Sequence, residues 1–180
     1  VHRVIAAIAP NDSVERLETL GVTVVQAEAR FRDAVTIEAA GQAYTARRMV
    51  IATGSRAALP PIPGLAEVPY FTNETLFENR EKPEHLIVIG GGPIGMEMAQ
   101  AHRRLGSRVT VVEAFDPLAK DDPELTAILL EKLASDGITI LTRTPVKGVR
   151  RTETGIAVDT DGKGTVEGSH LLVAAGRIPN

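Results

Sequence analysis

The chain has no cysteine and no tryptophan, and aromatic residues make up 3% of its 180 residues. Without a thiol the chain as it stands forms no disulfide, no thiolate zinc site and no cysteine nucleophile. The four histidines are dispersed without metal-ligand spacing, so no metal site is expected. We therefore expect no catalytic residue in this chain.

Long apolar runs and an excess of positive charge are missing as well. No run approaches the roughly 20 residues that span a bilayer, and no charged leader precedes a short apolar core. The formal charge of -3 gives no electrostatic footprint for nucleic acid. We therefore expect a cytoplasmic protein with no membrane or nucleic-acid partner.

A hydrophobic fraction of 43% and a charged fraction of 24% are ordinary for a globular protein. The length suits one sizeable domain, or one domain with a piece of another. The sequence begins at Val1 and ends at Asn180, directly after strand-like residues. We expect it to be an internal segment of a longer protein.

The first 60 residues predict a β-rich unit with a short helix. The opening "VHRVIAAIAP" suits a helix or a strand, and so short a run does not separate them. Asp12 and Glu15 have capping-box spacing before a short helix that Gly21 would end. The stretches "VTVVQAEARF", "AVTIEAAGQAYTARR" and "MVIATGS" predict strands, the second folding as a hairpin around Ala40-Gly41.

A proline-rich stretch, "RAALPPIPGLAEVP", then predicts a domain boundary near residues 60 to 65. From residue 85 the pattern alternates strand and helix: "HLIVIG", "RVTVVE" and "ITIL" predict parallel strands buried on both faces. Residues 146–168 predict an antiparallel meander, and "HLLVAAG" another buried strand. The fold class is α/β, a Rossmann-like domain beside a β-rich remnant.

Two helices connect these strands. The first runs from Gly95 to Leu105, with Met98 and Ala101 on its apolar face, and ends at Gly106. The second begins after an Asp122 cap. Its apolar stripe is predicted from these residues: Leu125, Ile128, Leu129, Lys132 and Leu133.

The turn after the first parallel strand has the spacing G-x-G-x-x-G at Gly90, Gly92 and Gly95. Gly90 allows a sharp turn, Gly92 allows the backbone to approach a pyrophosphate, and Gly95 allows the helix to pack on the strand. The helix N-terminus then faces the phosphates. The predicted dinucleotide-binding turn also includes Gly91, Pro93 and Ile94.

Glu113 ends the next strand, 23 residues after Gly90. A carboxylate at this place accepts hydrogen bonds from the ribose hydroxyls and repels a 2′-phosphate. The following "AFDPLAK" supplies no arginine. The sequence therefore favours NAD over NADP, the alternative being a solvated glutamate at a strand end.

Three stretches in order, "VIATGSRAALPPIPGL", "VIGGGPIGMEMAQAHRRLGSRVTVVE" and "LLVAAGRIPN", resemble the pyridine nucleotide-disulfide oxidoreductases, which include dihydrolipoamide dehydrogenase and mercuric reductase. The resemblance implies an FAD domain interrupted by an inserted NAD domain, in a homodimeric parent. It assigns residues 1–62 to the FAD domain, 63–176 to the NAD domain and 177–180 to the return into the FAD domain.

The resemblance also implies cofactor contacts. It places NAD adenine near Val146, and it pairs Glu97 with a lysine beside the flavin. Pro93 stands where many relatives carry an aromatic residue that gates the nicotinamide pocket. The residues implied to contact the flavin are Ala29, Thr53, Gly54, Ser55, Gly176 and Arg177.

The family's redox cysteine pair and its first glycine motif lie outside this chain. The leading hypothesis is the NAD(H)-binding segment of a dihydrolipoamide dehydrogenase-like enzyme that transfers hydride between NADH and FAD. The electron acceptor, a disulfide or a metal ion, stays open. Two alternatives are a fragment of a flavoprotein without redox cysteines, such as an NADH oxidase or ferredoxin reductase, and a non-enzymatic NAD-binding module.

Overall fold

The computed structural model describes residues 2–180, and its contacts divide the chain into two compact units. The first unit runs to Thr53, and the second is Gly54–Asn180. The units are described separately because each has its own contacts.

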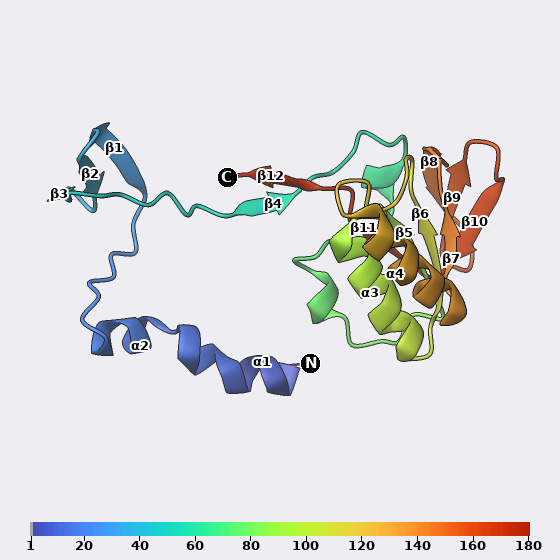
Figure 1. The fold of residues 1–180 in the computed structure, drawn as a ribbon, viewed down its shortest axis with the longest axis horizontal. Helices are drawn as coiled ribbons and strands as arrows, with labels where there is room; N and C mark the ends of the chain where they lie inside the picture. The colour runs from blue at the N-terminus through green and yellow to red at the C-terminus, as the bar shows by residue number, and fades with distance from the viewer. Residues whose placement is uncertain (1) are drawn as a thin grey trace. The chain divides into compact units, whose positions relative to one another are not determined.

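The first unit contains two short helices, α1 (His2–Ile8) and α2 (Val14–Thr19), and a three-stranded antiparallel sheet (Figure 1). The sheet consists of β1 (Ala29–Asp33), β2 (Thr36–Ala39) and β3 (Gln42–Thr45). The predicted hairpin is confirmed: Ala40 and Gly41 join β2 to β3, with φ values of 50° and 74°. Such positive φ values are required by the tight turns that match strand twist.

Three local predictions in this unit were wrong. Ser13, not Asp12, caps α2, because its Oγ accepts the Arg16 N–H at 3.1 Å. "VTVVQAEARF" is a strand only from Ala29 onward, and "MVIATGS" forms no strand before its last residue. Val50 and Ile51 are exposed, because no described strand of this unit pairs with them.

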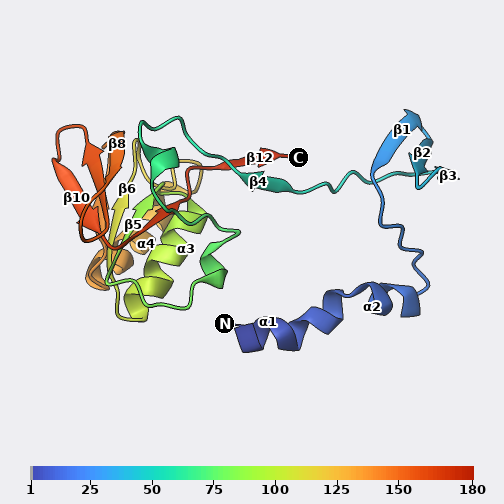
Figure 2. The same cartoon turned by 180° about the vertical axis from the view of Figure 1, so that it is seen from behind.

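The second unit is built on a four-stranded parallel sheet in the order β11-β5-β6-β7. Helices α3 (Pro93–Arg104) and α4 (Pro123–Ser135) cover one face, and an antiparallel meander covers the other (Figures 1 and 2). The parallel strands are β5 (His85–Ile89), β6 (Arg108–Val112), β7 (Thr139–Leu141) and β11 (His170–Val173). The meander strands are β8 (Val146–Arg151), β9 (Ile156–Thr160) and β10 (Thr165–Gly168).

Alternating side chains of β5 supply a separate core on each face of the sheet. Leu86 and Val88 pack with the helices, whereas Ile87 and Ile89 pack with the meander. Every residue of β5 is buried, as predicted for a parallel strand covered on both sides. Burial of each large aliphatic side chain contributes about 1.5–3 kcal/mol relative to exposure.

The predicted apolar faces of the two helices were right at Met98 and Leu133, which pack in the core on the helix side of the sheet, and wrong at the other predicted positions. The buried residues of α3 are Gly95, Met96 and Ala99, while Leu105 is 69% exposed. In α4 only Leu133 is buried. Small side chains let α3 approach the sheet closely, a preference that a hydrophobicity pattern does not register.

The proline-rich stretch belongs to the second unit, because the boundary between the two units falls between Thr53 and Gly54, before this stretch. The short strand β4 (Ser55–Ala57) lies at the start of this region of the chain. It pairs antiparallel with β12 (Arg177–Pro179). The pairing joins segments that the sequence assigned to one domain. Pro63 then accepts a backbone hydrogen bond from Val149, which ties the stretch to β8.

Candidate functional site

A cleft of about 610 Å³ opens at the carboxyl end of the parallel sheet. Its walls are the turn after β5, the loop after β6, the segment after β11 and Asn73. In open α/β sheets, ligands bind in the crevice outside the carboxyl ends of the strands. Eight of the fifteen predicted cofactor residues line this cleft, namely Gly90, Gly91, Gly92, Pro93, Ile94, Glu113, Gly176 and Arg177.

Two glycines of the turn are required by the backbone around them. Gly90 has a φ of 112°, and a side chain on it would strike the Ala174 carbonyl group. A Cβ on Gly95 would strike the Gly90 carbonyl oxygen and come within 3.4 Å of Val88 Cγ1. Gly90 thus permits the turn, and Gly95 permits close packing of helix on strand.

Gly91 is fitted to Glu113. Its N–H donates a hydrogen bond of 2.5 Å to Glu113 Oε2, and a Cβ on Gly91 would lie 3.0 Å from the Glu113 Cβ and Cγ atoms. The Phe115 N–H donates to Glu113 Oε1 at 2.8 Å. A carboxylate has about four acceptor positions, so two remain for further donors.

Gly92 borders open space, because a Cβ placed on it would meet no atom of the described chain within 4 Å. It is the N-cap of α3, whose first residue is Pro93. The N-terminus of a helix offers unpaired N–H groups and the positive end of its dipole. The backbone at Gly92 therefore leaves room for an anionic group beside the helix.

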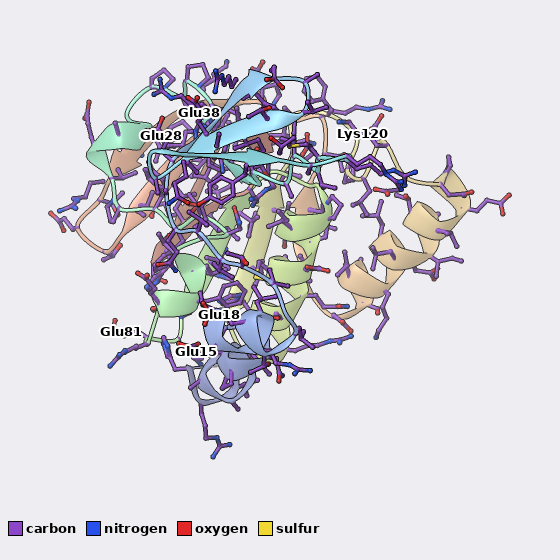
Figure 3. The ribbon with its side chains drawn as sticks, turned by 90° about the vertical axis from the view of Figure 1, so that its left-hand side faces the viewer. Glu15, Glu18, Glu28, Glu38, Glu81 and Lys120 are labelled. Carbon is purple, nitrogen blue, oxygen red and sulfur yellow. The ribbon has the colours of Figure 1, made fainter. Side chains whose placement is uncertain are left out.

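The loop after β6 carries charged and aromatic side chains into the same cleft. Phe115 is 74% exposed, and Asp116 forms a two-contact ion pair with Arg143 at 2.8 and 3.1 Å. Their hydrogen bond lowers the pKa of Asp116 and raises that of Arg143. Lys120, labelled in Figure 3, lies on the same loop and lines the cleft.

Two other predicted residues lie outside the cleft. Glu97 is exposed on α3 and lines a second groove of about 360 Å³ between α3 and α4, which Pro93 also borders. Val146 begins β8 and packs partly buried against the core on the meander side. Their assigned contacts with flavin and adenine stay predictions.

The residues assigned to the flavin fall in both units. Ala29 and Thr53 are exposed residues of the first unit. In the second unit the Arg177 guanidinium donates to the Ser55 Oγ at 2.7 Å and to the Ser55 carbonyl oxygen, and the Asn180 N–H donates to the Gly54 carbonyl oxygen at 3.2 Å. Two of the motifs that the resemblance assigned to the flavin thus meet across β4 and β12.

Several cleft residues escaped the sequence reading. Phe115, Asp116 and Lys120 lie in the loop that follows Glu113, and their place after a strand end was a usable signal. Asn73 belongs to no motif, and Ala174 lies in "LLVAAGRIPN" but was assigned no contact. Arg143 does not line the cleft, but it pairs with the cleft residue Asp116 because β7 lies beside β6.

None of the helices within residues 2–180 is long and apolar enough to cross a membrane. In the same part of the chain, no three histidine, aspartate or glutamate side chains come together as a metal site.

The parallel sheet, glycine turn and strand-end glutamate define a Rossmann-type fold. The family model described as pyridine nucleotide-disulphide oxidoreductase matches residues 7–180. The chain belongs to this family of FAD-dependent oxidoreductases, which confirms the resemblance drawn from the motifs and the α/β fold class.

Similar sequences carry the name mercuric reductase. The protein from Streptomyces lividans is 40% identical over 165 residues, which cover 87% of this chain and 35% of that protein. The protein from Bacillus cereus is 36% identical over 170 residues, covering 92% and 27%. The chain therefore spans about a third of the length of these relatives.

Solved structures agree on the fold. The flavoprotein disulfide reductase RclA from Escherichia coli has a TM-score of 0.81 at 25% identity, over 99% of this chain and 42% of that one. LpdA from Mycobacterium tuberculosis has a TM-score of 0.79 at 29% identity, over 98% and 41%.

Proposed function

We propose that the second unit binds NADH and is the pyridine-nucleotide segment of an FAD-dependent oxidoreductase. The observation that carries this proposal is the Glu113 carboxylate, held at the cleft by the N–H groups of Gly91 and Phe115. It has acceptor positions left for two ribose hydroxyls. A 2′-phosphate at the same place would meet a negative charge.

The cleft fits the rest of a dinucleotide. The open space at Gly92 suits a pyrophosphate at the N-terminus of α3. From the ribose held by Glu113, the cleft continues past Gly92 to Gly176 and Arg177, where the nicotinamide half would lie. A bound nicotinamide supplies the hydride chemistry, while this chain supplies position and charge.

In the whole enzyme we propose hydride transfer between NADH and FAD, with residues 1–62 and 177–180 belonging to the FAD domain and a homodimer as the assembly. The sequence hypothesis of a dihydrolipoamide dehydrogenase-like enzyme gains no specific support, because the similar proteins described above are named mercuric reductase. The two proposed redox partners are therefore NADH and FAD, and no final electron acceptor is proposed.

Titration of the 180-residue chain with NADH and NADPH tests the proposal. NADH should bind at least tenfold more tightly, because Glu113 repels a 2′-phosphate. A Glu113→Gln variant keeps the side-chain shape and removes the charge. It should therefore reduce the difference between the affinities for NADH and NADPH. Glu167→Gln, on β10 and outside the cleft, is the matched control. Equal or tighter NADPH binding by the unmodified chain would contradict the proposal.

A further inference from the structure

The loop that follows β6 is fastened to the loop that follows β7. The fastening consists of an ion pair and three backbone hydrogen bonds. The ion pair joins Asp116 to Arg143. The backbone bonds run from Glu113 N to Leu141 O at 2.9 Å, from Thr144 N to Glu113 O at 2.8 Å and from Arg143 N to Phe115 O at 3.0 Å.

Stability does not explain the Asp116–Arg143 pair. The two side chains are 59% and 77% exposed, and exposed ion pairs contribute little to folding. Arg143 also has a φ of 50°, in the left-handed region that non-glycine residues rarely adopt. A strained residue that forms an exposed pair at the edge of a cleft points to a positioning role.

Phe115 is the residue that this pair would position. Its ring is largely exposed and lines the cleft, while its N–H is held by Glu113 and its carbonyl group by Arg143. The adenine base is attached to the ribose assigned to Glu113, two residues away. Aromatic side chains stack on nucleobases through their flat apolar faces.

We propose that Phe115 stacks on the adenine ring of the dinucleotide and that the Asp116–Arg143 pair positions it. The inference rests on the proposed function and adds the adenine contact and its support. Phe115 touches the ligand, whereas Arg143 acts through the loop.

The test measures binding of NADH, ADP-ribose and reduced nicotinamide mononucleotide, which lacks adenosine, to the full chain. Phe115→Ala should weaken NADH and ADP-ribose binding about tenfold, because stacking on a base is lost. Binding of the mononucleotide should stay the same. Phe115→Tyr keeps the ring and should bind like the unmodified chain. Phe77→Ala, an exposed aromatic residue outside the cleft, is the matched control.

Arg143→Met should weaken ADP-ribose binding about three- to tenfold and leave the mononucleotide unaffected, and Arg143→Lys should restore part of the loss. Arg150→Met removes an exposed ion pair with Asp159 on the meander and should change nothing. ADP-ribose binding by Phe115→Ala within twofold of the unmodified chain would overturn the stacking role. An equal loss for ADP-ribose and the mononucleotide in Arg143→Met would overturn the positioning role. If the unmodified chain binds none of the three, the proposed function fails, and this inference with it.

Discussion

The backbone N–H of Gly91 donates a hydrogen bond to the carboxylate of Glu113, which lies at the end of the neighbouring strand. An alanine at position 91 would press its Cβ against the Glu113 side chain. Gly91→Ala should therefore displace Glu113 and weaken NADH binding several-fold, measured by calorimetric titration. Unchanged affinity would show that the Glu113 position does not depend on this glycine.

Alanine substitution should affect mainly dinucleotide binding at Gly92 and mainly stability at Gly95. Gly92→Ala meets no protein atom, so its unfolding free energy should change by no more than about 1 kcal/mol while dinucleotide affinity falls at least tenfold. Gly95→Ala forces a methyl group against the Gly90 carbonyl oxygen. It should lower the free energy of unfolding by about 1–3 kcal/mol. Denaturant unfolding and NADH titration of both variants check this. Equal stability losses would refute it.

Leu133 and Leu125 both belong to the predicted apolar stripe of α4, but only Leu133 lies in the observed core. Leu133→Ala removes a side chain that is 1% exposed and should destabilise the second unit by about 2–5 kcal/mol. Leu125→Ala removes one that is 67% exposed and should change stability by less than about 0.5 kcal/mol. Thermal unfolding measures both. A large effect at Leu125 would mean that α4 buries this face.

His85 should make stability depend on pH. Burial, with a smaller effect of Arg108, lowers its pKa, and burial lowers that of His170 as well. Below the ordinary value of about 6.5 the unfolded chain binds protons first, so stability should fall as pH decreases from about 6.5 and level off below the folded pKa. Each histidine contributes a slope of at most about 1.4 kcal/mol per pH unit.

Chemical unfolding between pH 7.5 and 5.5 measures this slope. His85→Gln keeps a polar partner for Thr110, which lies 2.9 Å from His85 Nε2, and should make the slope shallower. His2→Gln, an exposed histidine of the first unit, is the control. A slope that His85→Gln leaves unaltered would assign the effect to other groups.

The first unit should be the less protected part of the isolated chain. Among residues 2–53 only Ala39 is buried, whereas nine of the twelve largest fully buried side chains of the described chain lie in β5, β6 and β11. Few buried apolar contacts leave little free energy against local opening. Hydrogen exchange should be fast throughout residues 2–53 and slow in the three strands. Comparable protection in α2 and β5 would contradict this expectation.

The glycine turn, Glu113 and the strand–helix alternation could be predicted because they depend on local requirements: backbone conformation, spacing and burial on two faces. The helix faces could not. Leu105 is more hydrophobic than Gly95 and Ala99, yet Leu105 is exposed and the two smaller residues are buried, because close approach of helix and sheet depends on shape. The composition around Val50 and Ile51 suited a strand, but a strand needs a partner. No strand of the described first unit pairs with these residues.

By itself the sequence determined the order of the elements, the dinucleotide motif and the family resemblance, since these are written in neighbouring residues. Only the tertiary structure decided which side chains share the cleft. Phe115 lines the cleft, and Arg143 bonds to its carbonyl group because parallel pairing sets β7 beside β6 and brings two loops, distant along the chain, to one edge of the sheet. Hydrogen bonding between strands, which no local pattern encodes, is the physical reason.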